Sequence, residues 1–76
     1  MQSIGERAAQ AIRVQAAKKG IPIYEECENI GTSRKVYRDW NKMGRNPTAY
    51  FFQQMALAGY DIYWILTGKE NKNVTD

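Results

Sequence analysis

Histidine is absent from this chain of 76 residues, and cysteine occurs once, as Cys27. The lack of histidine removes the commonest general base and metal ligand, and no CxxC or HxxxH spacing is present. A single cysteine cannot form an intramolecular disulfide, so we expect Cys27 to be a reduced, buried thiol without a reactive role. These absences favour a protein that has no metal site, no cofactor and no enzymatic activity.

Carboxylates are the remaining groups that could act as catalytic acids and bases. Three of them, Glu25, Glu26 and Glu28, stand close together on one polar stretch with no apolar residues to enclose them. A tuned acid and base pair requires environments that separate the two pKa values. We therefore expect these glutamates to form the solvated face of a helix.

Long hydrophobic runs are also absent. The first twenty residues mix charged and small side chains too evenly for a secretory signal, and no apolar run approaches the length of a membrane span. A chain of this length is expected to form one small domain that depends on efficient helix packing. We expect a soluble cytoplasmic protein with no membrane partner and no evident small-molecule substrate.

The spacing of apolar residues predicts an all-α fold with five short helices and no strand. Ser3 and Glu6 have the spacing of a capping box at the start of the first helix, and Gly20 is expected to end it. Pro22 suits the first turn of a second helix that ends at Gly31. The apolar faces of these two helices are expected to consist of Ile4, Ala8, Ala11, Ile12, Ala16 and Ala17 in the first, and of Ile23, Cys27 and Ile30 in the second.

Three further helices are expected in the second half of the chain, each preceded by a residue that caps helices well. The fourth should run through Phe51, Phe52 and Met55. The residues expected to begin or end these helices are Ser33 for the third, Pro47, Thr48 and Gly59 for the fourth, and Asp61 and Gly68 for the fifth.

Positive charge is concentrated in the third of these helices and just after it. Wound at about 100° per residue, residues 34–43 separate into a cationic face and an apolar face. Such a helix anchors its apolar face in the core and presents its cations outward, although many basic strips of this kind are merely solvated. The cations are Arg34, Lys35, Arg38, Lys42 and Arg45 against the single Asp39, and the apolar residues are Val36, Tyr37, Trp40 and Met43.

The connection before this helix resembles a helix-turn-helix. Cys27 allows two helices to cross closely, Gly31 allows a left-handed backbone in the turn, and Tyr37 and Trp40 bury the back of the second helix. The segments GTSRKVYRDW, RNP and PTAYFFQQMALAGYDIYWILTG are similar to the DNA-binding domains of the lambda-repressor and Cro superfamily, also called XRE-type. The resemblance covers about residues 12–68.

This resemblance implies a compact five-helix lambda-repressor-like domain whose third helix lies in the major groove of DNA and whose second helix crosses the phosphate backbone. The implied function is a sequence-specific transcriptional regulator, most simply a phage or prophage-type repressor on a palindromic operator. Asp39 either accepts from a cytosine amino group or bonds Lys35 or Lys42 within the helix. The implied base contacts are Ser33, Arg34, Lys35, Arg38 and Asp39, and the implied phosphate contacts are Tyr24, Lys42, Arg45 and Asn46.

Three features depart from the family pattern. Ile23 stands where the family usually has a glutamine that contacts phosphate, and Glu26 stands where it commonly has an apolar residue. Residues 1–11 extend the amino end, either as the first turns of the first helix or as an arm, and we expect Arg7 within them to be solvated rather than bound to a phosphate. Residues 69–76 form a polar tail that suits either the end of a Cro-like protein or a link to a longer repressor.

The last helix has apolar side chains on all sides, and a short helix cannot bury all of them against one small core. We expect the surplus face to form a symmetric dimer contact, the alternative being that Tyr63 and Trp64 cover the core of a monomer. A protein-interaction module that retains the same fold, such as an antitoxin or anti-regulator, is the alternative function, and the glutamates of the second helix favour it. The residues of the predicted dimer contact are Ile62, Tyr63, Trp64, Ile65 and Leu66.

Overall fold

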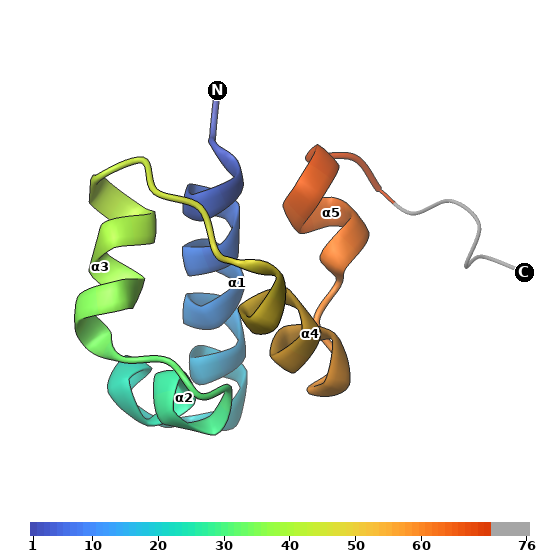
Figure 1. Ribbon diagram of the computed structural model, residues 1–76. Coiled ribbons are helices and arrows are strands. Elements are labelled where there is room, and N and C mark those ends of the chain that lie inside the picture. Colours follow the sequence, from blue (N-terminus) through green and yellow to red (C-terminus); the bar gives the residue numbers. More distant parts are fainter. Residues whose placement is uncertain (71–76) are drawn as a thin grey trace, which may run out of the picture.

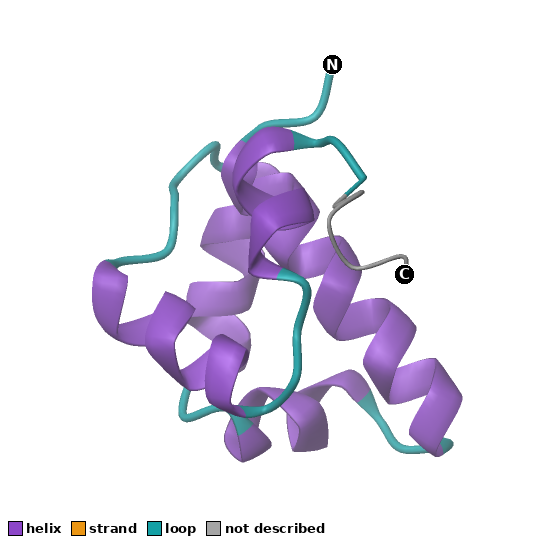
Figure 2. Ribbon diagram, turned by 90° about the vertical axis from the view of Figure 1, so that its right-hand side faces the viewer, coloured by secondary structure: helices purple, strands orange, loops and turns teal. Residues whose placement is uncertain are grey.

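The computed structural model describes residues 1–70, which form five α-helices and no strand (Figures 1 and 2). The helices are α1 (Ile4–Lys19), α2 (Ile23–Asn29), α3 (Arg34–Lys42), α4 (Ala49–Leu57) and α5 (Ile62–Thr67). The all-α prediction is confirmed for this part of the chain. Most of the predicted polar tail, from residue 71 onward, lies outside the described residues. None of the five helices is both long and apolar enough to cross a membrane.

Polar caps begin α1, α3 and α5 as the sequence predicts. The Ser3 hydroxyl accepts from the backbone N–H of Glu6 at 3.1 Å, and the Glu6 carboxylate accepts from the backbone N–H of Ser3 at 2.7 Å, which completes a capping box. The Ser33 hydroxyl and the Asp61 carboxylate each accept from the backbone N–H three residues later, at 3.2 Å and 3.0 Å. These local bonds fix where three of the five helices start.

The start of α2 differs from the prediction. Pro22 has an extended backbone and immediately precedes the helix rather than occupying its first turn. Its carbonyl oxygen accepts from the backbone N–H groups of Glu25 and Glu26. Ile23 is therefore the first residue of α2 and is exposed at its edge, whereas we expected it to share the buried face with Cys27 and Ile30.

α1 occupies the middle of the molecule, and α2, α3 and α5 each pack against it (Figure 1). Trp40 on α3 meets Phe51 on α4 edge to face, with ring centroids 5.5 Å apart. Besides Ile23, two further predicted apolar positions are wrong, since Ala17 is exposed and Met43 is 66% exposed just beyond the end of α3. The buried core consists of Ala8, Ala9, Ile12, Cys27, Ile30, Trp40, Met55, Tyr60 and Ile65.

Gly5 allows the first turn of α1 to lie directly against the loop that follows α3. A Cβ atom at this position would lie 2.0 Å from the carbonyl oxygen of Arg45 and 3.0 Å from that of Trp40. The backbone N–H of Gly5 donates to Oδ1 of Asn46 at 3.2 Å. The lack of a side chain at Gly5 therefore sets the distance between α1 and the residues that leave α3.

Arg7 ties α1 to the end of α5 and is not the solvated side chain that we expected. Its Nε donates to the carbonyl oxygen of Ile65 at 2.8 Å, and its Nη2 donates to that of Leu66 at 3.3 Å. Its Nη1 donates to the carbonyl oxygen of Gln2 at 2.7 Å. Carbonyl groups in the last turn of a helix have no partner within it, and a cation near them is favourable. Arg7 therefore caps a helix that is too short to be stable alone.

Glu26 is fully buried and is not part of the solvated face that we predicted. It accepts from Lys19 Nζ at 2.8 Å, from Asn29 Nδ2 at 3.1 Å and from the Tyr60 hydroxyl. Burial by itself raises the pKa of a carboxyl group, but these three donors outweigh it and hold the pKa of Glu26 below its ordinary value. Burial and the bond to Glu26 raise the pKa of Tyr60. The network joins α1, α2 and Tyr60, which lies in the connection between α4 and α5.

Candidate nucleic-acid interface

The connection between α2 and α3 is a tight turn built from the residues that the sequence singled out. Gly31 adopts a left-handed backbone with φ of 77°. The backbone N–H of Thr32 donates to the carbonyl oxygen of Cys27 at 2.9 Å. Cys27 is fully buried, which confirms its predicted place in the core, and burial raises the pKa of its thiol, with the Glu26 carboxylate adding to this rise. The turn thus presents the first residues of α3 at the surface.

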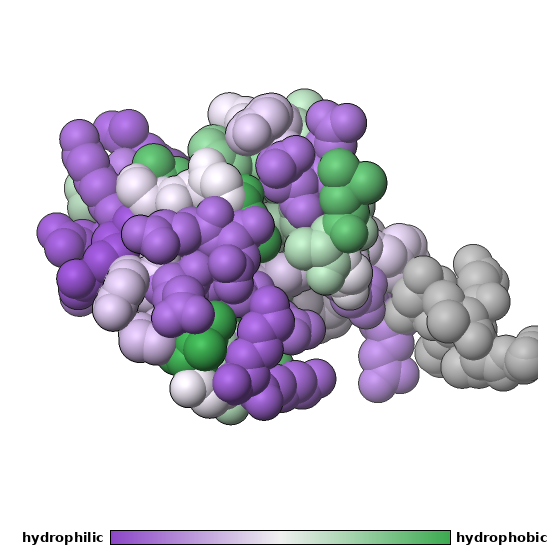
Figure 3. All heavy atoms as spheres, turned by 90° about the horizontal axis from the view of Figure 1, so that it is seen from below, coloured by the Kyte–Doolittle hydropathy of each residue, from purple (hydrophilic) through white to green (hydrophobic). Residues whose placement is uncertain are grey.

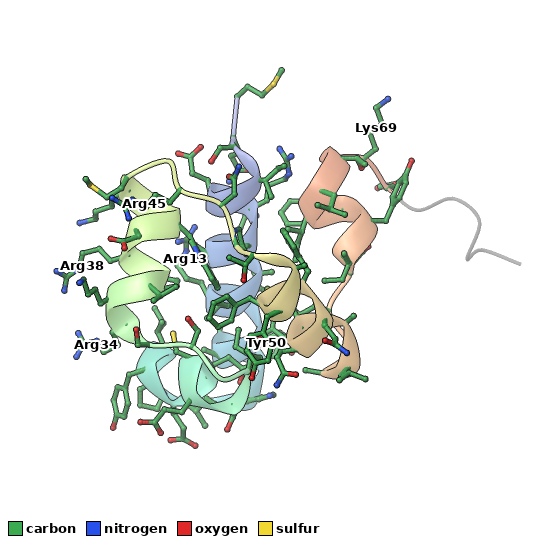
Figure 4. The ribbon with its side chains drawn as sticks, viewed as in Figure 1. Arg13, Arg34, Arg38, Arg45, Tyr50 and Lys69 are labelled. Carbon is green, nitrogen blue, oxygen red and sulfur yellow. The ribbon has the colours of Figure 1, made fainter. Side chains whose placement is uncertain are left out.

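The cations of α3 and of the loop after it face outward. Arg34, Lys35, Arg38, Lys42 and Arg45 are all exposed. Arg34 and Arg38 point away from the body of the molecule in Figure 4. Residues 1–70 contain one salt bridge, between Lys19 and Glu26, so none of these five cations pairs with a carboxylate of the described chain. Their charge is available to an external anion.

Asp39 is half-buried on α3, between the cationic and apolar faces. Of the two alternatives left open for it, the bond to Lys35 or Lys42 does not form, because no salt bridge joins Asp39 to either lysine. The other alternative, a contact with a cytosine amino group, stays a prediction.

The side chains predicted to contact phosphate lie on three elements. Tyr24 is exposed on α2, Lys42 lies in the last turn of α3, and Arg45 and Asn46 follow in the loop. Asn46 also has a structural role that the sequence did not reveal, since its Oδ1 accepts from the backbone N–H of Gly5. Its amide nitrogen donates to no acceptor within residues 1–70 and can serve an external one.

A further contact behind α3 was missed at the sequence level. Arg13 reaches from α1 toward α3 (Figure 4). Its Nη1 donates to the Tyr37 hydroxyl at 3.1 Å and to Oδ1 of Asn41 at 3.0 Å. Tyr37 and Asn41 are one turn apart on α3, so a single guanidinium fixes the rotation of this helix against α1. The only signal in the sequence was the presence of polar residues on the flank of an otherwise apolar face.

The surface around these groups is polar. Seen from below, hydrophilic side chains dominate the side of the molecule on which α3 lies (Figure 3). Glu25 and Glu28 are exposed on α2, so a negatively charged face adjoins the positively charged one. An approaching polyanion is therefore attracted by α3 and repelled by the outer face of α2.

The residues of the predicted dimer contact separate into three groups. Ile65 is fully buried in the core and is not available to a second copy, which corrects its place in the prediction. Ile62 and Trp64 are half-buried against the core. Tyr63 and Leu66 remain 46% and 44% exposed and define the outer face of α5.

No group of three or more cysteine and carboxylate side chains within residues 1–70 is placed to hold a metal ion. The exposed arginine and lysine side chains of this surface can recognise an anion by charge and by donating hydrogen bonds. Comparisons with protein families, curated proteins and solved structures found no match for this chain.

Proposed function

We propose that this protein is a sequence-specific DNA-binding regulator of transcription that uses α2, the turn and α3 as a helix-turn-helix. The observation that carries the proposal is the set of five exposed cations on α3 and the following loop, none of them paired with a carboxylate of the described chain. Positively charged side chains on one helix face are the electrostatic footprint expected of a protein that binds nucleic acid.

In this proposal α3 enters the major groove, whose width admits an α-helix. Arg34, Lys35 and Arg38 donate to guanine O6 and N7, and Asp39 accepts from a cytosine amino group. Lys42 and Arg45 contact phosphates, which strengthens binding to any sequence. The aromatic underside of α3, with Trp40 buried in the core, holds the helix in the outward position that these contacts need.

We further propose that two copies associate through Tyr63 and Leu66 on the outer face of α5. Their exposure supports this contact, because apolar side chains that remain exposed on a short helix favour association. A symmetric dimer would place two copies of α3 about 34 Å apart on a palindromic operator. The protein would then act as a repressor, of the phage or prophage type, by occupying a promoter.

The test is a titration of a mixed-sequence duplex with the whole protein at 50 and 200 mM salt, in which binding is measured by fluorescence anisotropy. If a dimer makes four phosphate contacts through Lys42 and Arg45, affinity should fall about 100-fold between the two salt concentrations. No salt-sensitive binding at either concentration would refute the proposal. That result would favour the protein-interaction module, with the exposed Glu25 and Glu28 of α2 as its recognition surface.

The roles within the interface are separated by a second experiment. A duplex selected from a random pool serves as the specific sequence, and Lys35→Ala is compared with Arg45→Ala. Lys35→Ala should cost about 1 to 3 kcal/mol on the selected duplex and relax the preference at one base position. Arg45→Ala should weaken binding to selected and random duplexes alike. Equal losses on both duplexes for both variants would contradict base contact by α3.

A further inference from the structure

A small depression lies beside α3, between its row of cations and the start of α2. It is lined by Ile23, Arg34, Tyr37, Arg38, Asn41 and Lys42. Its volume of about 190 Å³ is below the roughly 300 to 1,000 Å³ of cavities that hold small organic ligands. It therefore suits a single chemical group rather than a whole small molecule.

The walls of this depression carry positive charge and no carboxylate. Arg34, Arg38 and Lys42 follow one another at intervals of four residues, so they form a row along one side of α3. Asp39 is rotated about 100° from Arg38, away from this row. A neighbouring depression at the start of α3 is lined in part by Glu28 and does not share this character.

Arg13 determines which atoms of Tyr37 and Asn41 are available in the depression. A guanidinium has only donors, so it must face the amide oxygen of Asn41 and the lone pairs of the Tyr37 hydroxyl. The Asn41 NH₂ group and the Tyr37 hydroxyl proton are then left as donors. Neither donates to an acceptor within residues 1–70. Within residues 1–70 Arg13 forms no salt bridge and its side-chain hydrogen bonds go to these neutral groups, so its charge adds to the positive potential behind the depression.

We propose that this depression binds one phosphodiester group of the DNA backbone, with the Tyr37 hydroxyl and the Asn41 amide donating to its oxygens. Arg13 acts as a positioning residue that orients both donors. Lys42 contacts this phosphate, Arg34 and Arg38, whose end groups contact bases in the proposed complex, add positive potential along the same side of α3, and Ile23 lines the depression from α2. This assignment rests on the proposed binding of DNA and adds two contacts, from Tyr37 and Asn41, to those named above.

Asn41→Asp separates this binding role from a purely structural one. The aspartate keeps the shape of the side chain and its bond to Arg13, which becomes an ion pair, so the melting temperature should be unchanged or higher. It replaces the amide donor by a negative charge, which repels phosphate. We expect affinity for selected and random duplexes to fall about tenfold or more, and the slope of log affinity against log salt to be reduced by about 0.9 for each protomer, which is about 1.8 for the proposed dimer.

Gln53→Glu is the matched control, because it makes the same change from amide to carboxylate at an exposed position of α4. Its effect on affinity should remain below about twofold, as expected for a screened charge. Tyr37→Phe removes the second donor and keeps the ring, and should weaken binding about threefold, which is typical of one neutral hydrogen bond.

NMR of the Asn41 side-chain amide in the unmodified protein distinguishes the source of the phosphate. Its resonances should shift on addition of duplex, and inorganic phosphate at matched ionic strength should shift them more than chloride does. Salt-dependent DNA binding that Asn41→Asp leaves unchanged would overturn this inference and leave the proposed function standing. If no DNA binds at all, the proposed function fails. A shift with inorganic phosphate would then mark a free-anion site and overturn the assignment to the DNA backbone, and the absence of any shift would overturn the site altogether.

Discussion

Gly5→Ala is the substitution for which local and tertiary physics make opposite predictions. Within a helix, alanine is more favourable than glycine by up to about 1 kcal/mol, so α1 taken alone should be stabilised. In the folded protein the added Cβ would lie 2.0 Å from the carbonyl oxygen of Arg45 and 3.0 Å from that of Trp40. Both are backbone atoms, so they cannot move aside as a flexible side chain would. α1 and the loop after α3 must therefore separate.

The size of the effect follows from these contacts. Overpacking of this kind typically costs about 1 to 3 kcal/mol. Lengthening the bond from the Gly5 N–H to Asn46, which is 3.2 Å long, adds about 0.5 to 1.5 kcal/mol. After subtraction of the gain in helix propensity, we expect a net loss of about 2 kcal/mol. For a domain of this size that lowers the melting temperature by about 10 °C.

Urea denaturation monitored by far-UV circular dichroism measures this loss directly. Asn46→Ala is the control, because it removes the bond to Gly5 without adding an atom, and should cost only about 1 kcal/mol. A Gly5→Ala protein that is as stable as the unmodified one, or more stable, would show that α1 does not approach the loop after α3.

Three further predictions concern the caps and the buried carboxylate. Arg7→Met should lower the free energy of unfolding by about 1.5 to 3 kcal/mol and should increase the rate of amide hydrogen exchange more in α5 than in α1. An equal increase in both helices would contradict the capping role. Ser33→Ala should cost about 1 kcal/mol in urea denaturation, and Ser33→Thr much less, because the threonine keeps the oxygen that caps α3. Glu26→Gln should cost about 2 kcal/mol at pH 7, where the unmodified protein benefits from an ionised carboxylate. Because the pKa of Glu26 is below 4.5 in the folded protein, that benefit is lost as the pH falls further below 4.5. A difference in the free energy of unfolding between the two proteins that stays constant at acid pH would contradict this.

Helix positions could be predicted from the sequence because their signals are local. Ser3, Ser33 and Asp61 each bond a backbone group three residues away, so neighbouring residues are enough to recognise them. The outward direction of the α3 cations is also local, since it follows from the angle between successive residues of a helix. The predicted start of α2 is one residue too early, because proline is favourable both in the first turn of a helix and immediately before it.

The polar contacts inside the fold could not be predicted, because their partners are distant in the chain. Arg7 bonds a residue 58 positions away, Glu26 one that is 34 away, and Arg13 one that is 28 away. The sequence shows these residues only as charged side chains, without their partners, and charged side chains are usually exposed to solvent. For Glu26 one signal was present, because it stands where the resembling family commonly has an apolar side chain. The depression beside α3 could not be predicted for the same reason, since its lining combines Ile23 of α2 with residues of α3 that are 11 or more positions away.

Cys27 has a practical consequence that follows from its solitary, fully buried position. A thiol reagent such as a disulfide dye reacts with the ionised sulfur and must first reach it, so modification requires the helices around Cys27 to part. The raised pKa of the thiol slows the reaction further in the closed state. Because no second cysteine competes for the dye, the rate of labelling reports how often the structure opens around Cys27. If the protein binds DNA as proposed, protection from the dye on adding DNA would measure how far the duplex suppresses these fluctuations.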